Sequence, residues 1–156
     1  MTQLPNFTVE GGCICGALRY QLTAPPLAVY ACHCKDCQRA GSAPYAVGLF
    51  ADKASFDVIA NGGIHRFDKP ADSGRVVPQF SCAVCGTRVW HEPVTAPNRV
   101  IIRAGTLDDA DWAVPAAHIW TASRSPLANI PADAPQFPGQ VPDRQVLIDA
   151  WEAALP

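Results

Sequence analysis

Gly-Cys-Ile-Cys-Gly at residues 12–16 and Ser-Cys-Ala-Val-Cys-Gly at residues 81–86 are the stretches that decide the fold of this chain. Zinc prefers four sulfur or nitrogen ligands in a tetrahedron, and a Cys-x-Cys or Cys-x-x-Cys turn places two sulfurs close enough to bind one ion. A glycine directly follows each turn, and it lets the backbone fold so that its amides face the sulfurs. We therefore expect one closed, structural zinc site with the ligands Cys13, Cys15, Cys82 and Cys85.

This pairing joins the start of the chain to its middle. A metal bound by both turns is a long-range crosslink that stabilises β elements, because binding energy becomes folding energy. The alternatives for these four residues are buried free thiols or oxidised pairs. The chain has seven cysteines, an odd number that excludes a complete set of internal disulfides.

The remaining cysteines, Cys32, Cys34 and Cys37, lie within six residues and have no fourth cysteine to complete a site. Zinc sites with three protein ligands keep a position for water or substrate, so this group predicts a catalytic zinc with an open position. That position can take an external thiol, which zinc would present as a thiolate. We expect this second zinc to be labile.

Two alternatives remain for the triplet: a redox pair among its thiols, or closure of the site by a histidine. His33 lies between two ligands, and alternation of side chains in an extended turn is expected to direct it away from the metal. The other candidates for a fourth ligand are His65, His91 and His118.

Composition narrows the class of protein. The 156 residues suit a single domain over residues 1–156, and a content of 49% hydrophobic against 17% charged residues supports a real core. A net charge of −2 gives no basic field for nucleic acid. No apolar run reaches membrane-spanning length and no signal peptide is evident, so the expectation is a cytoplasmic protein without a membrane partner.

Short β-rich runs separated by turn residues indicate a mainly antiparallel β domain. Fifteen prolines and eleven glycines interrupt the chain, which argues against long helices before the C-terminus. The expected strands cover residues 17–23, 27–31, 45–50, 55–60, 75–80, 88–91, 99–104 and 117–120.

The chain from residue 115 onward divides into two parts. Six prolines between residues 115 and 142 predict an ordered, extended segment with little regular structure. Leu147, Trp151 and Leu155 then recur every four residues behind Asp143, a suitable N-cap, so a short amphipathic C-terminal helix is expected to pack on the core.

The cysteine groups and their surroundings resemble the glutathione-dependent formaldehyde-activating enzymes, a family that shares its domain with centromere protein V. The resemblance is carried in order by residues 12–16 with Tyr20, 32–37 with Gly41-Ser42, 80–87, 105–109 and His118-Ile119. It implies a β-tent fold with a structural zinc on Cys13, Cys15, Cys82 and Cys85 and a catalytic zinc on Cys32, Cys34 and Cys37.

The resemblance also implies a reaction, the condensation of formaldehyde with glutathione, classed as a carbon–sulfur lyase in the reverse sense. The expected partners are therefore a small thiol and a carbonyl compound. Lys35, Arg39 and Arg124 are candidate cations for the carboxylates of glutathione. Two readings from other classes stay open: a zinc-stabilised binding module without catalysis, and a redox-responsive cysteine protein.

Overall fold

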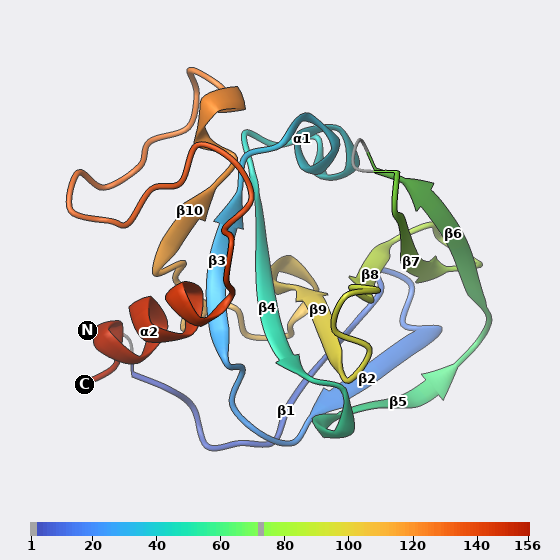
Figure 1. Ribbon diagram of the computed structural model, residues 1–156. Helices are drawn as coiled ribbons and strands as arrows, with labels where there is room; N and C mark the ends of the chain where they lie inside the picture. Colours follow the sequence, from blue (N-terminus) through green and yellow to red (C-terminus); the bar gives the residue numbers. More distant parts are fainter. Residues whose placement is uncertain (1–2, 72–73) are drawn as a thin grey trace.

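The computed structural model describes residues 3–71 and 74–156 and is mainly β, as the sequence predicts (Figure 1). Its strands form two sheets. The smaller sheet has the order β1-β2-β5, with bounds Val9–Gly12, Leu18–Leu22 and Phe56–Asn61. The larger sheet has the order β10-β3-β4-β9-β8-β7-β6, with bounds Ala117–Ile119, Ala28–Cys32, Ala46–Asp52, Arg99–Arg103, Arg88–His91, Val76–Cys82 and Ile64–Pro70.

All the strands expected from the sequence form, with ends within two residues of the predicted ones. Strand pairing is antiparallel except between β10 and β3, which run parallel. Two strands were not predicted. β1 contains two glycines among its four residues, and β6 carries His65, Arg66, Asp68 and Lys69, a polar pattern typical of a sheet edge, where charges discourage further pairing.

Aromatic side chains join the two sheets. The ring of Tyr20 in β2 lies 5.2 Å from that of Phe56 in β5, which lies 5.2 Å from Trp90 in β8. Trp90 stacks on its cross-strand partner Phe80 in β7, with ring centroids 4.8 Å apart. This continuous contact between rings fixes the smaller sheet against strands β8 and β7 of the larger one.

A short helix follows β3. α1 (Lys35–Gly41) begins behind Cys34, whose Sγ accepts a hydrogen bond from the Cys37 amide at 3.4 Å. It ends at Ser42, which has the left-handed conformation with φ of 47°. Gly41 and Ser42 therefore form the C-terminal end of a helix that the strand-rich pattern of the sequence did not predict.

The C-terminal helix forms as predicted, with one correction at its start. α2 (Gln145–Ala154) has Arg144 at its N-cap position, while Asp143, the predicted cap, accepts from the Gln145 amide at 2.9 Å one residue earlier. Leu147 and Trp151 are buried, and the helix packs beside β3 (Figure 1). Among the described residues, no helix is long and apolar enough to cross a membrane.

The proline-rich segment is ordered with little regular structure, as expected. Apart from β10 and the single turn of helix η3 (Thr121–Ser123), it follows the edge of the sheet. The His118 amide donates to the Pro135 carbonyl at 2.9 Å, and the Phe137 amide donates to the His118 carbonyl at 2.8 Å. These bonds cover the outer edge of β10.

Candidate metal centres and the pocket between them

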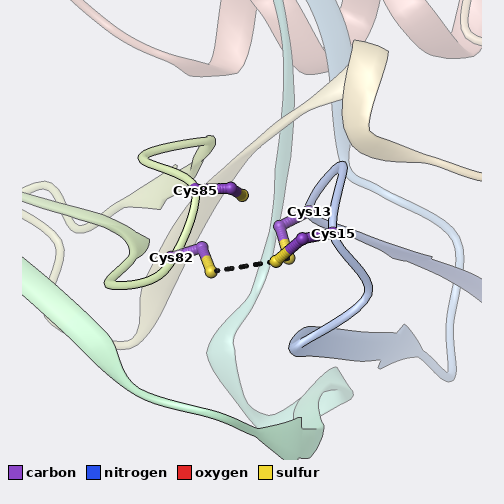
Figure 2. A group of neighbouring side chains, drawn as sticks. All are labelled: Cys13, Cys15, Cys82 and Cys85. Carbon is purple, nitrogen blue, oxygen red and sulfur yellow. Dashed lines mark hydrogen bonds between the residues drawn. The ribbon is translucent and has the colours of Figure 1, made fainter.

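Cys13, Cys15, Cys82 and Cys85 come together, with their sulfur atoms all within 4.8 Å of one another (Figure 2). Sγ of Cys15 lies 3.5 Å from Sγ of Cys13 and 3.8 Å from Sγ of Cys82. A tetrahedron with zinc–sulfur bonds of about 2.3 Å has sulfur–sulfur edges of about 3.8 Å. The four-sulfur group therefore fits a zinc ion.

The two turns that carry these sulfurs are built alike. The first cysteine of each donates its amide to the carbonyl five residues on, from Cys13 to Leu18 and from Cys82 to Thr87, both at 2.9 Å. Each turn reverses through the glycine after its second cysteine, with φ of 77° at Gly16 and 75° at Gly86. Only glycine adopts this conformation without strain, so these glycines have the role the sequence predicts.

Backbone amides face the buried sulfurs. The Leu18 amide donates to Sγ of Cys13 at 3.2 Å, and the Val84 amide donates to Sγ of Cys82 at 3.4 Å. Amide donors of this kind stabilise thiolates and orient them toward a metal. Cys13 and Cys82 are buried while the other two ligand candidates are exposed, so one side of the group is sealed by the core.

Cys32, Cys34 and Cys37 form the second group, and their three sulfurs also lie within 4.8 Å of one another. Cys32 ends β3, Cys34 is the N-cap of α1, and Cys37 lies in its first turn. The strand-to-helix transition thus gathers three half-buried thiols at one point. A set of three soft sulfur ligands this close suits zinc.

No histidine, carboxylate or further cysteine in the described chain joins this group as a fourth ligand. His33 is turned away, as the alternation argument predicts. Its Nε2 lies 2.9 Å from Nδ1 of His118, and both rings are buried, with 0% and 2% of their surfaces exposed. Burial lowers the pKa of both histidines, so the pair is neutral at pH 7.

The backbone of His33 is fixed from three directions. Its amide donates to the Ile119 carbonyl at 2.9 Å, and its carbonyl accepts from Nε2 of Gln38 at 2.7 Å and from Oγ of Ser123 at 3.0 Å. Since His33 separates Cys32 from Cys34, these bonds hold the two sulfurs in position.

Arg103 adjoins the three-cysteine group. Nη1 and Nη2 of Arg103 each lie 3.9 Å from Sγ of Cys37. Hydrogen bonds from the Cys32 and Cys34 thiols lower the pKa of the Cys37 thiol, and the positive charges of Arg103 and Arg88 lower it further. Burial lowers the pKa of Arg88 to about 10, with the charge of Arg103 as a further cause, so the Arg88 guanidinium is charged at neutral pH.

His91 is hydrogen-bonded to Arg88. Its Nδ1 lies 3.4 Å from Nη2 of Arg88 and accepts from it, because burial lowers the pKa of His91 to about 3 and keeps the ring neutral. A neutral imidazole beside a guanidinium acts as an acceptor that orients the cation. His91 is therefore a hydrogen-bonded histidine and not a ligand of the three-cysteine group.

An open pocket of about 460 Å³ is lined by Cys85 of the four-cysteine group and by Arg103, which contacts Cys37 of the three-cysteine group. This volume is in the range of small-molecule sites. Its lining comes from the turn of the four-cysteine group, the end of α1 and the two arginines. The residues are Ile14, Ala40, Gly41, Cys85, Gly86, Thr87, Arg88 and Arg103.

The predicted cations do not line this pocket in the described structure. Lys35 donates to Oε1 of Gln38 at 3.3 Å, Arg39 is exposed on α1, and Arg124 follows η3. Arg88 and Arg103 were missed because both lie in strands whose other residues are mostly apolar. A charged residue within a buried strand is the signal that could have identified them.

Comparison with known proteins gives one family. The family model described as glutathione-dependent formaldehyde-activating enzyme matches residues 8–123. A curated protein of Halomonas elongata named for the same family is 30% identical over 87 residues. That match covers 53% of this chain and 54% of the relative, so this chain spans about half the length of the curated relative.

A solved structure supports the fold. The crystal structure of a Rhodobacter sphaeroides protein superimposes with a TM-score of 0.50 at 20% sequence identity. The alignment covers 64% of this chain and 87% of that protein. At this identity the likeness concerns the fold alone.

Proposed function

Because the chain belongs to the glutathione-dependent formaldehyde-activating enzyme family, we propose that it condenses a small thiol with formaldehyde or a related carbonyl compound. In the reverse direction this is a carbon–sulfur lyase reaction. Glutathione is the thiol that the family description suggests.

The reaction itself needs no redox partner. The thiol sulfur forms a bond to the carbonyl carbon, the carbon–oxygen π bond breaks, and the proton of the thiol ends on the oxygen. The difficult requirement is a nucleophilic sulfur at neutral pH, since a free thiol with a pKa of about 8.5 is mostly protonated there.

Cys32, Cys34 and Cys37 would hold the zinc ion that meets this requirement. When bound, zinc supplies deprotonation of a coordinated thiol. The chain's own residues do the rest. His33 keeps two of the ligands in place through its backbone bonds, and Arg103 places positive charge beside Cys37. The pocket next to these arginines offers room for the remainder of the substrate.

One observation carries the proposal: three thiols converge, and no fourth protein ligand in the described chain completes their group. A purely structural module would favour closure of this site, as in the four-cysteine group. The lining of the adjacent pocket by two cations supports a substrate site over a binding module without catalysis.

The test is the rate of S-hydroxymethylglutathione formation. Mixtures of formaldehyde and glutathione react spontaneously, so exchange between free and condensed glutathione is measured by NMR with and without protein containing two zinc ions. Acceleration proportional to protein concentration supports the proposal. An unchanged exchange rate, with glutathione binding intact, would show that the chain binds the thiol without catalysing its addition.

A further inference from the structure

No carboxylate among the described residues neutralises the positive charges of Arg88 and Arg103. Nε of each guanidinium is buried and has no hydrogen-bond partner among residues 3–71 and 74–156. Neither arginine forms an ion pair with a carboxylate within those residues, whereas Arg19, Arg66 and Arg99 do. Buried donors without partners are costly, and a charged group raises that cost.

The three-cysteine group does not use all of this charge. Three thiolates outweigh the two charges of a zinc ion by one, and two guanidinium groups more than reverse that balance. One positive charge therefore remains before a substrate enters, and a thiolate on the zinc ion would balance it. A carboxylate would gain from the local field and the paired donors of the two guanidinium groups rather than from a net surplus of charge. Both arginines also line the 460 Å³ pocket, which opens beside the three-cysteine group.

We propose that Arg88 and Arg103 form an anion subsite that binds a carboxylate of the thiol substrate. The inference rests on the proposed function and narrows it: the thiols that this protein uses carry a carboxylate, and neutral thiols are poor substrates. Guanidinium groups match carboxylates because their planar donors can make paired hydrogen bonds. His91 is a positioning residue in this arrangement, since it accepts a hydrogen bond from Arg88.

The test is calorimetric titration of the zinc-loaded protein with glutathione and with glutathione diethyl ester. The ester retains the thiol and the amino group but has lost both negative charges. We expect the wild-type protein to bind glutathione about 10–100-fold more tightly than the ester, the range of a charge-assisted hydrogen-bonded pair. In the double variant Arg88→Gln/Arg103→Gln the affinities for the two ligands should become equal within about threefold.

A matched control is Arg66→Gln, which removes an exposed arginine on β6 that pairs with Asp68. This variant should keep the wild-type preference. Zinc content is measured on every variant, because the arginines could instead serve only to balance the thiolate charges. In that case the double variant would lose affinity for both ligands equally and keep the preference, which would overturn the inference.

Further outcomes separate this inference from the proposed function. Equal affinity of the wild-type protein for glutathione and the ester overturns the subsite and leaves the thiol reaction standing. Absence of glutathione binding to the zinc-loaded wild type overturns both. If the double variant does not fold, the variants Arg88→Lys and Arg103→Lys are tested instead, because lysine keeps the charge without the paired donors. Their preference for glutathione over the ester should be reduced. An undiminished preference counts against the subsite.

Discussion

Nη1 and Nη2 of Arg103 lie equally far, 3.9 Å, from Sγ of Cys37, although 66 residues separate the two positions. The contact links strand β9 to the first turn of α1 and brings a permanent cation to the three-cysteine group. It also places the pocket beside that group, because Arg103 lines the pocket. The candidate metal site and the proposed anion subsite are thus adjacent in this fold.

Cys34→Ala should separate catalysis from folding. Cys34 is half-buried and belongs to a short surface helix, so its loss should remove one of two zinc ions and lower condensation activity at least about hundredfold. The fold should survive. Zinc quantification, the NMR exchange rate and circular dichroism check the three effects, and unfolding of the variant would mean that the triplet is structural.

Cys82→Ala, in contrast to Cys34→Ala, should strongly destabilise the fold. Cys82 is 1% exposed, ends β7 and belongs to the turn that meets the N-terminal cysteines. Losing a ligand of a structural metal belongs to the severe class of substitutions, about 4 kcal/mol or more. A fall in melting temperature of about 8–16 °C is expected by calorimetry. A melting temperature close to that of Cys34→Ala would contradict the division of roles.

Metal removal should occur in two steps. The three-cysteine group offers three ligands and lies beside an open pocket, while the four-cysteine group offers four and has two buried members. With excess EDTA, one equivalent of zinc should leave first and take the activity with it, and added zinc should restore both. A colorimetric zinc indicator measures the release. Simultaneous loss of both ions would argue for equivalent sites.

His118→Phe should destabilise the protein by about 1–3 kcal/mol, because it leaves the buried Nε2 of His33 without a partner. The double variant His33→Phe/His118→Phe should cost less than the sum of the two single variants, since it removes both polar groups together. Urea unfolding measures the cycle, with the exposed His65→Phe as control. Additive losses would show that the pair contributes no coupling.

Acid should destabilise the fold through His91. The pKa of His91 is lowered to about 3 by burial, and by the charges of Arg88 and Arg103, whereas an unfolded histidine titrates near 6.5. Below pH 6.5 the unfolded chain therefore binds a proton that the folded chain does not, and stability falls as the pH drops. This histidine should account for about 1–2 kcal/mol lost between pH 7.5 and 5.

Comparison of wild type with His91→Gln isolates that contribution, since zinc ligands and carboxylates titrate in both proteins. The variant should lose less stability over the same pH interval in urea unfolding. The exposed His65→Gln should behave as wild type. Identical pH dependence in wild type and His91→Gln would assign the acid sensitivity to other groups.

Local chemistry allowed much of the fold and of both cysteine groups to be predicted. A Cys-x-Cys or Cys-x-x-Cys turn sets the separation of its own sulfurs, and Gly16 and Gly86 supply the backbone conformation wherever those turns lie. The short β-rich runs between turn residues, which predict the strands, likewise depend only on residues close together in the sequence. β6 was missed because its charged pattern is that of a sheet edge, and nothing local says that residues 64–70 are the edge.

The sequence by itself therefore determined the mainly β class, the division of seven cysteines into four and three, and the C-terminal helix. Only the tertiary structure decided that Arg103 meets Cys37, that Arg88 and Arg103 line one pocket, and that His33 pairs with His118. The reason is physical: cysteine turns and helix faces are set by residues a few positions apart. The arginine and histidine contacts depend instead on which distant strands pair and in what register, and that is fixed by packing of the whole core.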